Sequence, residues 1–312
     1  RLLARDLAAG LAGGYLRQAR AARRLRGRFD LALAAGDIVP LGAAWLARTR
    51  CIFVACAKSA HGRRGDGHGA PERWLMRRTC AAVIPRDALT AERMAAHGLP
   101  VRALGNPMMD GTVPRAPLPA APGVTRIACL AGSRRDAAEN ARCLLAAGAA
   151  LAERVPGPLE LLFPVHPALD PRQVQAGGWA PSPDPGTRVL AGPRDARAVF
   201  LHDRFAAVLA ASVLALGMAG TANEQAVGTG LPLVAAPGAG NQGPAFARMK
   251  AAYFGAAAVT VARDPAAIAA AAAEILDDPG RAGRMAAAGR ARMGPPGASA
   301  AIAALVAEDL AR

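Results

Sequence analysis

Residues 216–228 hold the pattern in this sequence with the clearest chemical meaning, a glycine turn that opens a helix. Gly217 and Gly220 form the turn, and Thr221 and Glu224 follow it. The first turn of a helix offers backbone N–H groups without helical partners, and the helix dipole adds positive charge, so a phosphate binds well there. Glycines let the phosphate approach the backbone. Glu224 is then placed to accept hydrogen bonds from the hydroxyls of a nucleotide ribose.

The same spacing has a purely structural explanation. Thr221 followed three residues later by Glu224 is the pattern of a capping box, in which two side chains satisfy the N–H groups at the start of a helix. Spacing alone does not distinguish the two explanations.

Two further loops follow apolar segments that we expect to be strands of the same sheet. Ser133 and Arg134 follow one strand, and Asn241 and Gln242 lie in a polar loop after another. Ligands of parallel sheets bind beyond the carboxyl ends of the strands, and a guanidinium suits a phosphate. The chain is so rich in arginine that a solvated surface position is the alternative for Arg134.

Three more polar residues stand at predicted strand ends. Asp37 could serve as a general base that deprotonates an acceptor hydroxyl, and a helix N-cap is its alternative role. Asn106 and His166 are candidates to face the cleft between the two predicted domains, as is Asp37. The other histidines lack the spacing of metal ligands, so we expect no metal site, and nothing in the sequence implies a cofactor.

Helices and strands alternate through the first part of the chain. Parallel strands need crossover connections, so this alternation predicts an α/β domain whose parallel sheet has helices on both faces. The expected helices span 2–26, 41–49, 71–78 and 89–97, and the expected strands span 29–35, 51–57, 80–85 and 101–104.

A proline-rich stretch at 107–122 excludes regular structure, and a second doubly wound α/β domain is expected after it. We predict a first domain at 1–113, a linker at 114–123, a second domain at 124–296 and a helix at 297–312 that crosses back to the first domain. The expected later strands are 125–131, 159–165, 188–191, 206–211 and 231–235, and the expected helices are 136–153, 195–202, 223–227, 265–276 and 302–310.

The chain carries a large basic excess. A formal charge of +15 and an isoelectric point near 11.2 favour an anionic partner such as a membrane surface. Arginine supplies 36 of the 38 basic residues, which the bias of a GC-rich genome explains equally well. No base-stacking or zinc-finger motif accompanies the charge, so we do not expect nucleic acid as a partner.

No segment is expected to cross a membrane. The longest apolar run, at 205–223, is interrupted by glycines and a serine and falls short of the ~18 to 20 residues that span a bilayer. The N-terminal residues do not resemble a signal peptide, so we expect a cytoplasmic location, peripheral on the inner face of the membrane. The five cysteines are odd in number and lack metal-ligand spacing, which predicts reduced residues.

Four segments together resemble the lipid-A-disaccharide synthase-related family: Gly36–Leu41, Arg86–Ala91, Gly105–Gly111 and Gly217–Gln225. The family is similar to the B-type glycosyltransferases, in which one Rossmann-like domain holds the nucleotide donor and the other admits the acceptor. The resemblance therefore implies the glycosyltransferase-B architecture of two doubly wound domains. The family's first strand and glycine-rich acceptor loop do not precede the first expected helix, so the first domain is expected to be incomplete.

The resemblance also implies a role for each candidate residue. Donor-binding roles fall to Glu224 for the ribose, to Thr221, Gly217 and Gly220 for the phosphates, to Ser133 and Arg134 for the pyrophosphate, to Asn241 and Gln242 for the sugar, and to Gln225 as part of the same motif. Asp37 matches the base of the synthase only approximately.

The implied activity is a metal-independent, inverting transfer of an N-acetylhexosamine-type sugar from a UDP-sugar to a lipid-linked or glycolipid acceptor. Two alternatives remain open. A nucleotide-sugar 2-epimerase would need acid and base groups on both faces of the sugar, and a nucleotide-binding module would need no catalytic group.

Overall fold

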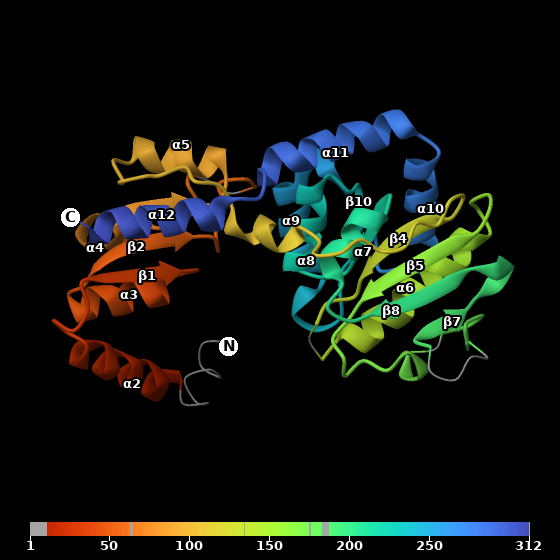
Figure 1. Ribbon diagram of the computed structural model, residues 1–312, viewed down its shortest axis with the longest axis horizontal. Coiled ribbons are helices and arrows are strands. Elements are labelled where there is room, and N and C mark those ends of the chain that lie inside the picture. The colour runs from red at the N-terminus through yellow and green to blue at the C-terminus, as the bar shows by residue number, and fades with distance from the viewer. Residues whose placement is uncertain (1–10, 63–64, 134, 175, 183–186, 312) are drawn as a thin grey trace. The chain divides into compact units, whose positions relative to one another are not determined.

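The computed structural model describes residues 11–62, 65–133, 135–174, 176–182 and 187–311 (Figure 1). The chain divides into two compact units. Unit 1 contains Arg1–Asn106 and Gly297–Arg312, and unit 2 contains Pro107–Pro296. Each unit has its own sheet with helices packed against it, so the predicted α/β class with two Rossmann-like parallel sheets is confirmed. Among the described residues, no helix combines the length and apolarity that crossing a membrane requires.

Unit 1 is built on three parallel strands in the order β1-β2-β3. Val101 adds a single parallel bridge to Val83, so the strand expected at 101–104 is reduced to one paired residue. The elements are α2 (Leu11–Arg24), β1 (Leu31–Ala35), α3 (Ile38–Ala47), β2 (Arg50–Ala55), α4 (Ala70–Thr79), β3 (Cys80–Pro85), α5 (Ala88–Ala96) and α12 (Ala298–Leu310).

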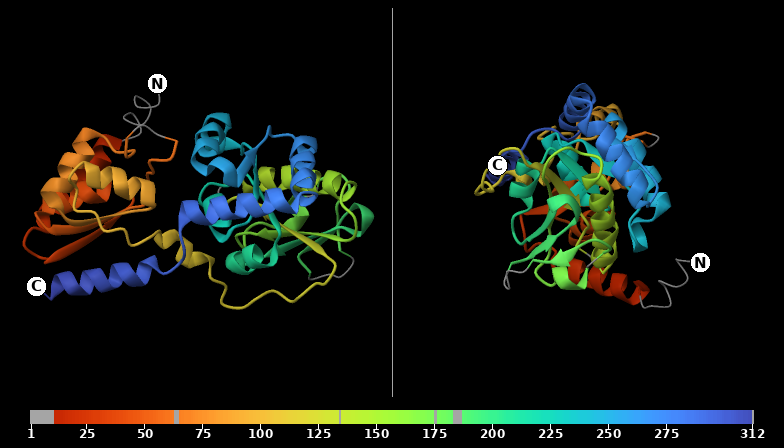
Figure 2. Two further views of the ribbon diagram at one scale, coloured as in Figure 1. Left: turned by 90° about the horizontal axis from the view of Figure 1, so that it is seen from above. Right: turned by 90° about the vertical axis from the view of Figure 1, so that its right-hand side faces the viewer.

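The two faces of β2 carry different partners, as the twofold alternation of a strand requires. Phe53 belongs to a buried cluster with residues of α3, α4 and α5. Ile52 and Val54 belong to a second cluster that includes Ile302 of α12. Helix α12 therefore covers one face of the sheet of unit 1, although unit 2 separates it from β3 along the chain; Figures 1 and 2 show it in dark blue beside the orange strands.

A buried polar cluster fixes the loop between β2 and α4. Lys58 Nζ lies 2.5 Å from Glu72 Oε1, and the other oxygen of Glu72 accepts the Gly69 N–H at the start of α4. Burial lowers the pKa of His68, against the opposing influence of Glu72. Glu72 thus links Lys58, near the end of β2, to the start of α4.

Unit 2 has an eight-stranded sheet in the order β11-β10-β9-β4-β5-β8-β7-β6. Neighbouring strands are parallel except that β7 runs antiparallel to both β8 and β6, so one edge departs from the predicted all-parallel arrangement. The strands are β4 (Thr125–Leu130), β5 (Leu159–Pro164), β6 (Ala180–Pro181), β7 (Val189–Ala191), β8 (Arg197–Leu201), β9 (Leu214–Gly217), β10 (Leu233–Ala235) and β11 (Ala258–Thr260).

Helices cover both faces of this sheet. Ile127 and Cys129 of β4 belong to one buried cluster with residues of α6 and α10, whereas Ala128 and Leu130 belong to another with residues of α7, α8 and α11. The helices are α6 (Ala137–Ala152), α7 (Phe205–Ala211), α8 (Thr221–Thr229), α9 (Pro244–Phe254), α10 (Pro265–Leu276) and α11 (Pro279–Met293), with short 3-10 turns at Pro107–Thr112, Pro171–Gln173, Pro193–Asp195, Gly240–Gln242 and Gly255–Ala257.

Two adjacent predictions in unit 2 were wrong. The helix expected at 195–202 is strand β8, which pairs with β5, and the strand expected at 206–211 is helix α7. Arg194 and Asp195 have positive φ, so the chain turns there and the following residues can pair with the sheet. An apolar run as short as that of α7 suits a helix or a strand equally well, and packing decides between them.

Candidate functional site

The order of strands in unit 2 creates a crevice between β4 and β9. From β4 the chain passes through α6 to β5 on one side, and it later returns to β9 on the other side of β4. Such a topological switch point is where parallel sheets bind ligands, because the crossover helices on its two sides lie on opposite faces and leave a gap at the carboxyl edge.

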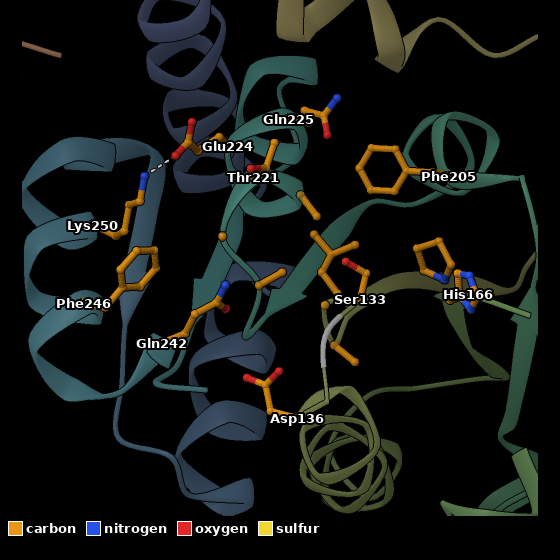
Figure 3. Close-up of a pocket in the computed structure, with 17 residues that line it drawn as sticks. Ser133, Asp136, His166, Phe205, Thr221, Glu224, Gln225, Gln242, Phe246 and Lys250 are labelled. Atoms are coloured by element: carbon orange, nitrogen blue, oxygen red, sulfur yellow. Dashed lines mark hydrogen bonds and ion pairs between the residues drawn. The ribbon is translucent and has the colours of Figure 1, made fainter. Parts of the chain in front are cut away.

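A cavity of about 630 Å³ occupies this switch point (Figure 3). Its lining includes seven residues that the sequence predicted: Ser133, His166, Gly220, Thr221, Glu224, Gln225 and Gln242. Four other large or charged residues of the lining were missed: Asp136, Phe205, Phe246 and Lys250. In Figure 3, Glu224 and Lys250 lie on one side of the cavity, and His166 and Phe205 lie on the opposite side.

The amino end of α8 opens directly onto the cavity. Gly220 is the N-cap of α8 and Thr221 is its first residue, so Thr221 does not cap the helix and the capping-box explanation is wrong for this pair. A Cβ atom on Gly220 would stand 3.0 Å from Nε2 of Gln242, so the turn and the Gln242 side chain lie close together at this side of the cavity. The N–H groups of the first turn of α8 have no partner within the helix and can bind an anion.

Glu224 and Lys250 form an ion pair at the cavity wall (Figure 3). The side chain of Glu224 is 5% exposed and that of Lys250 is 17% exposed. Lys250 Nζ lies 4.9 Å from the centre of the Tyr253 ring and 5.5 Å from that of Phe246, so aromatic rings also favour its charge. The ion pair stabilises an ionised carboxylate at the edge of the cavity, where it can accept hydrogen bonds.

Asn140 is a buried residue of α6 that ties two loops of the site together. Its Nδ2 donates to the carbonyl of Ala131 at 3.0 Å, and its Oδ1 accepts the N–H of Ala239 at 2.9 Å. The first bond fixes the loop that carries Ser133, and the second fixes the loop that carries Gln242. Asn140 therefore holds the two loops in register, and sequence reasoning did not identify it.

Replacing Asn140 with Leu is expected to destabilise unit 2 and to loosen both loops. The change leaves the buried Ala131 carbonyl without its partner, at a cost of about 1 to 3 kcal/mol, and it removes the acceptor of the partly buried Ala239 N–H. Hydrogen exchange should show faster exchange of the Ala239 amide, whereas an unchanged rate would mean that Asn140 does not hold this loop.

Two residues of the predicted glycine motif have structural partners. Gly217 is the last residue of β9 and is not part of the cavity lining; a Cβ atom there would stand 2.3 Å from Oδ1 of Asn223, so the glycine makes room for that buried side chain. Gln225 lines the cavity and also donates to the carbonyl of Met108 at 2.8 Å. Gly217 thus supports α8 by packing.

The remaining candidates belong to unit 1 or lie outside the described residues. Asp37 is the N-cap of α3 and accepts the Val39 N–H at 2.9 Å, which is the alternative role weighed for it. Asn106 is fully buried in unit 1. Arg134 and the side chain of Asn241 lie outside the described residues.

His166 is the one cleft candidate that reaches the cavity. It follows β5, and its Nδ1 accepts the Ala168 N–H at 3.2 Å, which leaves Nε2 to meet a ligand. Within the described ranges, no three His, Cys, Asp or Glu side chains are grouped as metal ligands would be.

Comparison with solved structures identifies the architecture. The chain is similar to CalG4, the calicheamicin glycosyltransferase (TM-score 0.63, 16% identity, 98% of this chain and 81% of that one). It is also similar to UDP-GlcNAc 2-epimerase from Neisseria meningitidis bound to UDP-GlcNAc (TM-score 0.59, 14% identity, 94% of this chain and 81% of that one). A third similar structure is MurG from Acinetobacter baumannii (TM-score 0.57, 15% identity, 94% of this chain and 78% of that one).

At these identities the likeness shows the fold alone. No protein-family model matches the chain, and no curated protein matches it by sequence. The chain therefore has the glycosyltransferase-B fold, which glycosyltransferases and UDP-GlcNAc 2-epimerases share.

Proposed function

We propose that this chain is a glycosyltransferase that binds a UDP-sugar in the switch-point cavity of unit 2. The observation that carries the proposal is the buried Glu224 beside the amino end of α8, in one cavity. A carboxylate for the ribose and a helix terminus for the phosphates are the two groups that a nucleoside diphosphate requires.

The proposed reaction is a displacement at the anomeric carbon of the donor sugar. The acceptor hydroxyl attacks the anomeric carbon of the sugar, the bond from that carbon to the diphosphate oxygen breaks, and the hydroxyl proton passes to a base. The N–H groups of α8 stabilise the departing diphosphate, and so no metal ion is needed for that charge. Asp37 is the proposed base; its Oδ1 caps α3, and its Oδ2 is the oxygen that would take the proton.

The acceptor and the type of enzyme rest on the sequence resemblance. We propose a lipid-linked or glycolipid acceptor, an N-acetylhexosamine-type donor and a lipid-A-disaccharide synthase-like activity at an anionic membrane surface. The net charge of +15 supports such a surface, since anionic lipids attract a basic protein and salt weakens that attraction.

Calorimetric titration with UDP, GDP and UDP-GlcNAc tests the proposal. Uridine nucleotides are expected to bind with a preference over GDP, and UDP-GlcNAc should bind at the same site in competition with UDP. If no nucleotide binds to the folded chain, the proposal fails.

A 2-epimerase is the second candidate, because titratable side chains surround the cavity. Asp136 and Glu224 supply carboxylates, and His166 supplies an imidazole, from different sides of it (Figure 3). An epimerase breaks and reforms the C–H bond at C2 without any acceptor. Incubation of UDP-GlcNAc in D2O tests this candidate: deuterium at C2 supports the epimerase, and an unlabelled donor argues against it.

A further inference from the structure

Unit 1 contains a second cavity, lined largely by arginine. It measures about 630 Å³, and its eight lining residues are Arg26, Trp45, Leu46, Arg48, Thr49, Arg50, Arg78 and Thr79. Arginine makes up 36 of the 312 residues of the chain but four of these eight, so the bias in composition does not account for the cluster.

This cavity and Asp37, the predicted catalytic residue, lie at opposite edges of the sheet of unit 1. Arg50 begins β2, and Thr79 directly precedes β3, so the cavity is at the amino edge. Asp37 follows the carboxyl end of β1. The cavity is therefore separate from the carboxyl edge, where parallel sheets hold their substrates.

The guanidinium groups are only partly neutralised. Arg50 pairs with Asp309 at 2.8 Å, and Arg26 Nε donates to the Leu46 carbonyl at 2.9 Å. The side chains of Arg48 and Arg78 make no hydrogen bond or ion pair with the described residues, and none of the described lining residues is acidic. Arginine stays charged at every accessible pH, so the cavity is cationic and unbalanced.

Apolar and hydroxyl groups complete the cavity. Trp45 is 44% exposed and packs edge to face against Trp74, 51% exposed, with ring centroids 5.9 Å apart. The buried hydroxyl of Thr79 has no hydrogen-bond partner among the described residues. A ligand with several negative oxygens beside an apolar group matches this combination of donors and aromatic surface.

We propose that this arginine cavity binds a phosphate-bearing anion, independently of the nucleotide site in unit 2. Arginine forks fit phosphate oxygens in pairs, and two uncommitted guanidinium groups suit a multiply charged phosphate better than a single carboxylate. Such a phosphate can belong to a soluble ester or to the headgroup of a membrane lipid, and the two sources are separated by experiment.

Arg48 can be replaced by glycine without strain in the backbone. Its φ of +54° lies in the left-handed region that favours glycine, so Arg48→Gly removes the charge without adding backbone strain. Arg194 in unit 2 also has a positive φ, +53°, and its side chain is exposed, so Arg194→Gly is the matched control for charge and backbone. Arg78→Ala supplies a second variant in the cavity.

The test is calorimetric titration of the whole chain with pyrophosphate, in the presence of saturating UDP that occupies the cavity of unit 2. Arg48→Gly and Arg78→Ala are each expected to weaken the binding about tenfold, as expected for the loss of one charge-assisted contact, while Arg194→Gly binds like the unchanged chain. Equal affinity in all four proteins, or an equal loss in the Arg194→Gly control, would overturn the proposal.

Flotation with vesicles identifies the source of the phosphate. If the ligand is a lipid headgroup, phosphatidylglycerol vesicles should bind the chain, phosphatidylcholine vesicles should not, and Arg48→Gly should reduce the binding. If pyrophosphate binding depends on Arg48 but vesicle binding does not, the ligand is a soluble phosphate.

Discussion

Glu224→Gln is expected to weaken UDP binding about 10- to 100-fold, the largest effect on affinity that the site allows. A hydrogen bond to a carboxylate contributes about 1.5 to 3 kcal/mol and one to a neutral group about 0.5 to 1.5 kcal/mol. Gln keeps the shape of the side chain but loses this difference for each of the two ribose hydroxyls, which together accounts for the expected range. Calorimetry with UDP measures this change directly.

Lys250 makes it possible to separate binding from stability. Lys250→Met removes one partner of the ion pair with the 5% exposed Glu224, which should lower the free energy of unfolding by about 3 kcal/mol. The double variant Glu224→Gln with Lys250→Met has no unpaired charge, so we expect its stability to recover while its UDP affinity stays low. Recovery of both properties would show that Glu224 only stabilises the fold.

The other lysine of the chain supplies the control. Lys58 pairs with the buried Glu72 in unit 1, whereas Lys250 lines the cavity of unit 2. Lys58 and Lys250 are the only two lysines of the sequence. Glu72→Gln removes the same kind of ion pair, and it is expected to leave the affinity for UDP unchanged.

Gly289→Ala is expected to lower the free energy of unfolding more than the same substitution at any other glycine of α11. A Cβ atom at residue 289 would lie 2.2 Å from the carbonyl oxygen of Val227 in α8, and a backbone atom cannot rotate away. Alanine favours a helix over glycine by about 0.5 to 1 kcal/mol, but overpacking of this kind costs about 1 to 3 kcal/mol and occasionally more. The net loss should therefore be about 2 kcal/mol.

Gly283→Ala on the same helix should have the opposite sign. Gly283 is exposed, and no heavy atom lies within 4 Å of the position that its Cβ would take. Alanine should therefore stabilise α11 by about 0.5 to 1 kcal/mol. Urea unfolding of the two variants compares them; a loss in both would mean that α11 tolerates no change, and a gain in both would mean that α8 and α11 can move apart.

Local signals predicted some elements to the residue. Helix α10 spans the expected 265–276 because Asp264 caps it and Pro265 begins it, and both are sequence signals. Strand β3 likewise spans the expected 80–85. The exchange of helix and strand at β8 and α7 could not be predicted, because the positive φ of two non-glycine residues starts the strand and no local signal announces it.

The lining residues that lie in loops directly after strands could be predicted from the sequence. Ser133, Thr221 and Gln242 gather in one cavity because the carboxyl ends of neighbouring parallel strands meet at one edge. Lys250 was missed because it reaches the cavity from the middle of α9, through packing between helices. Its one sequence signal is rarity, a lysine in a chain that otherwise uses arginine.

The return of α12 to unit 1 has a consequence for synthesis on the ribosome. Ile84 emerges 218 residues and Ile52 emerges 250 residues before Ile302, their partner in the buried cluster. At about 5 to 20 residues per second, this apolar surface stays uncovered for roughly 10 to 50 s. Unit 1 thus begins to fold before unit 2 but can finish only after it, which makes the nascent chain a natural substrate for chaperones during that interval.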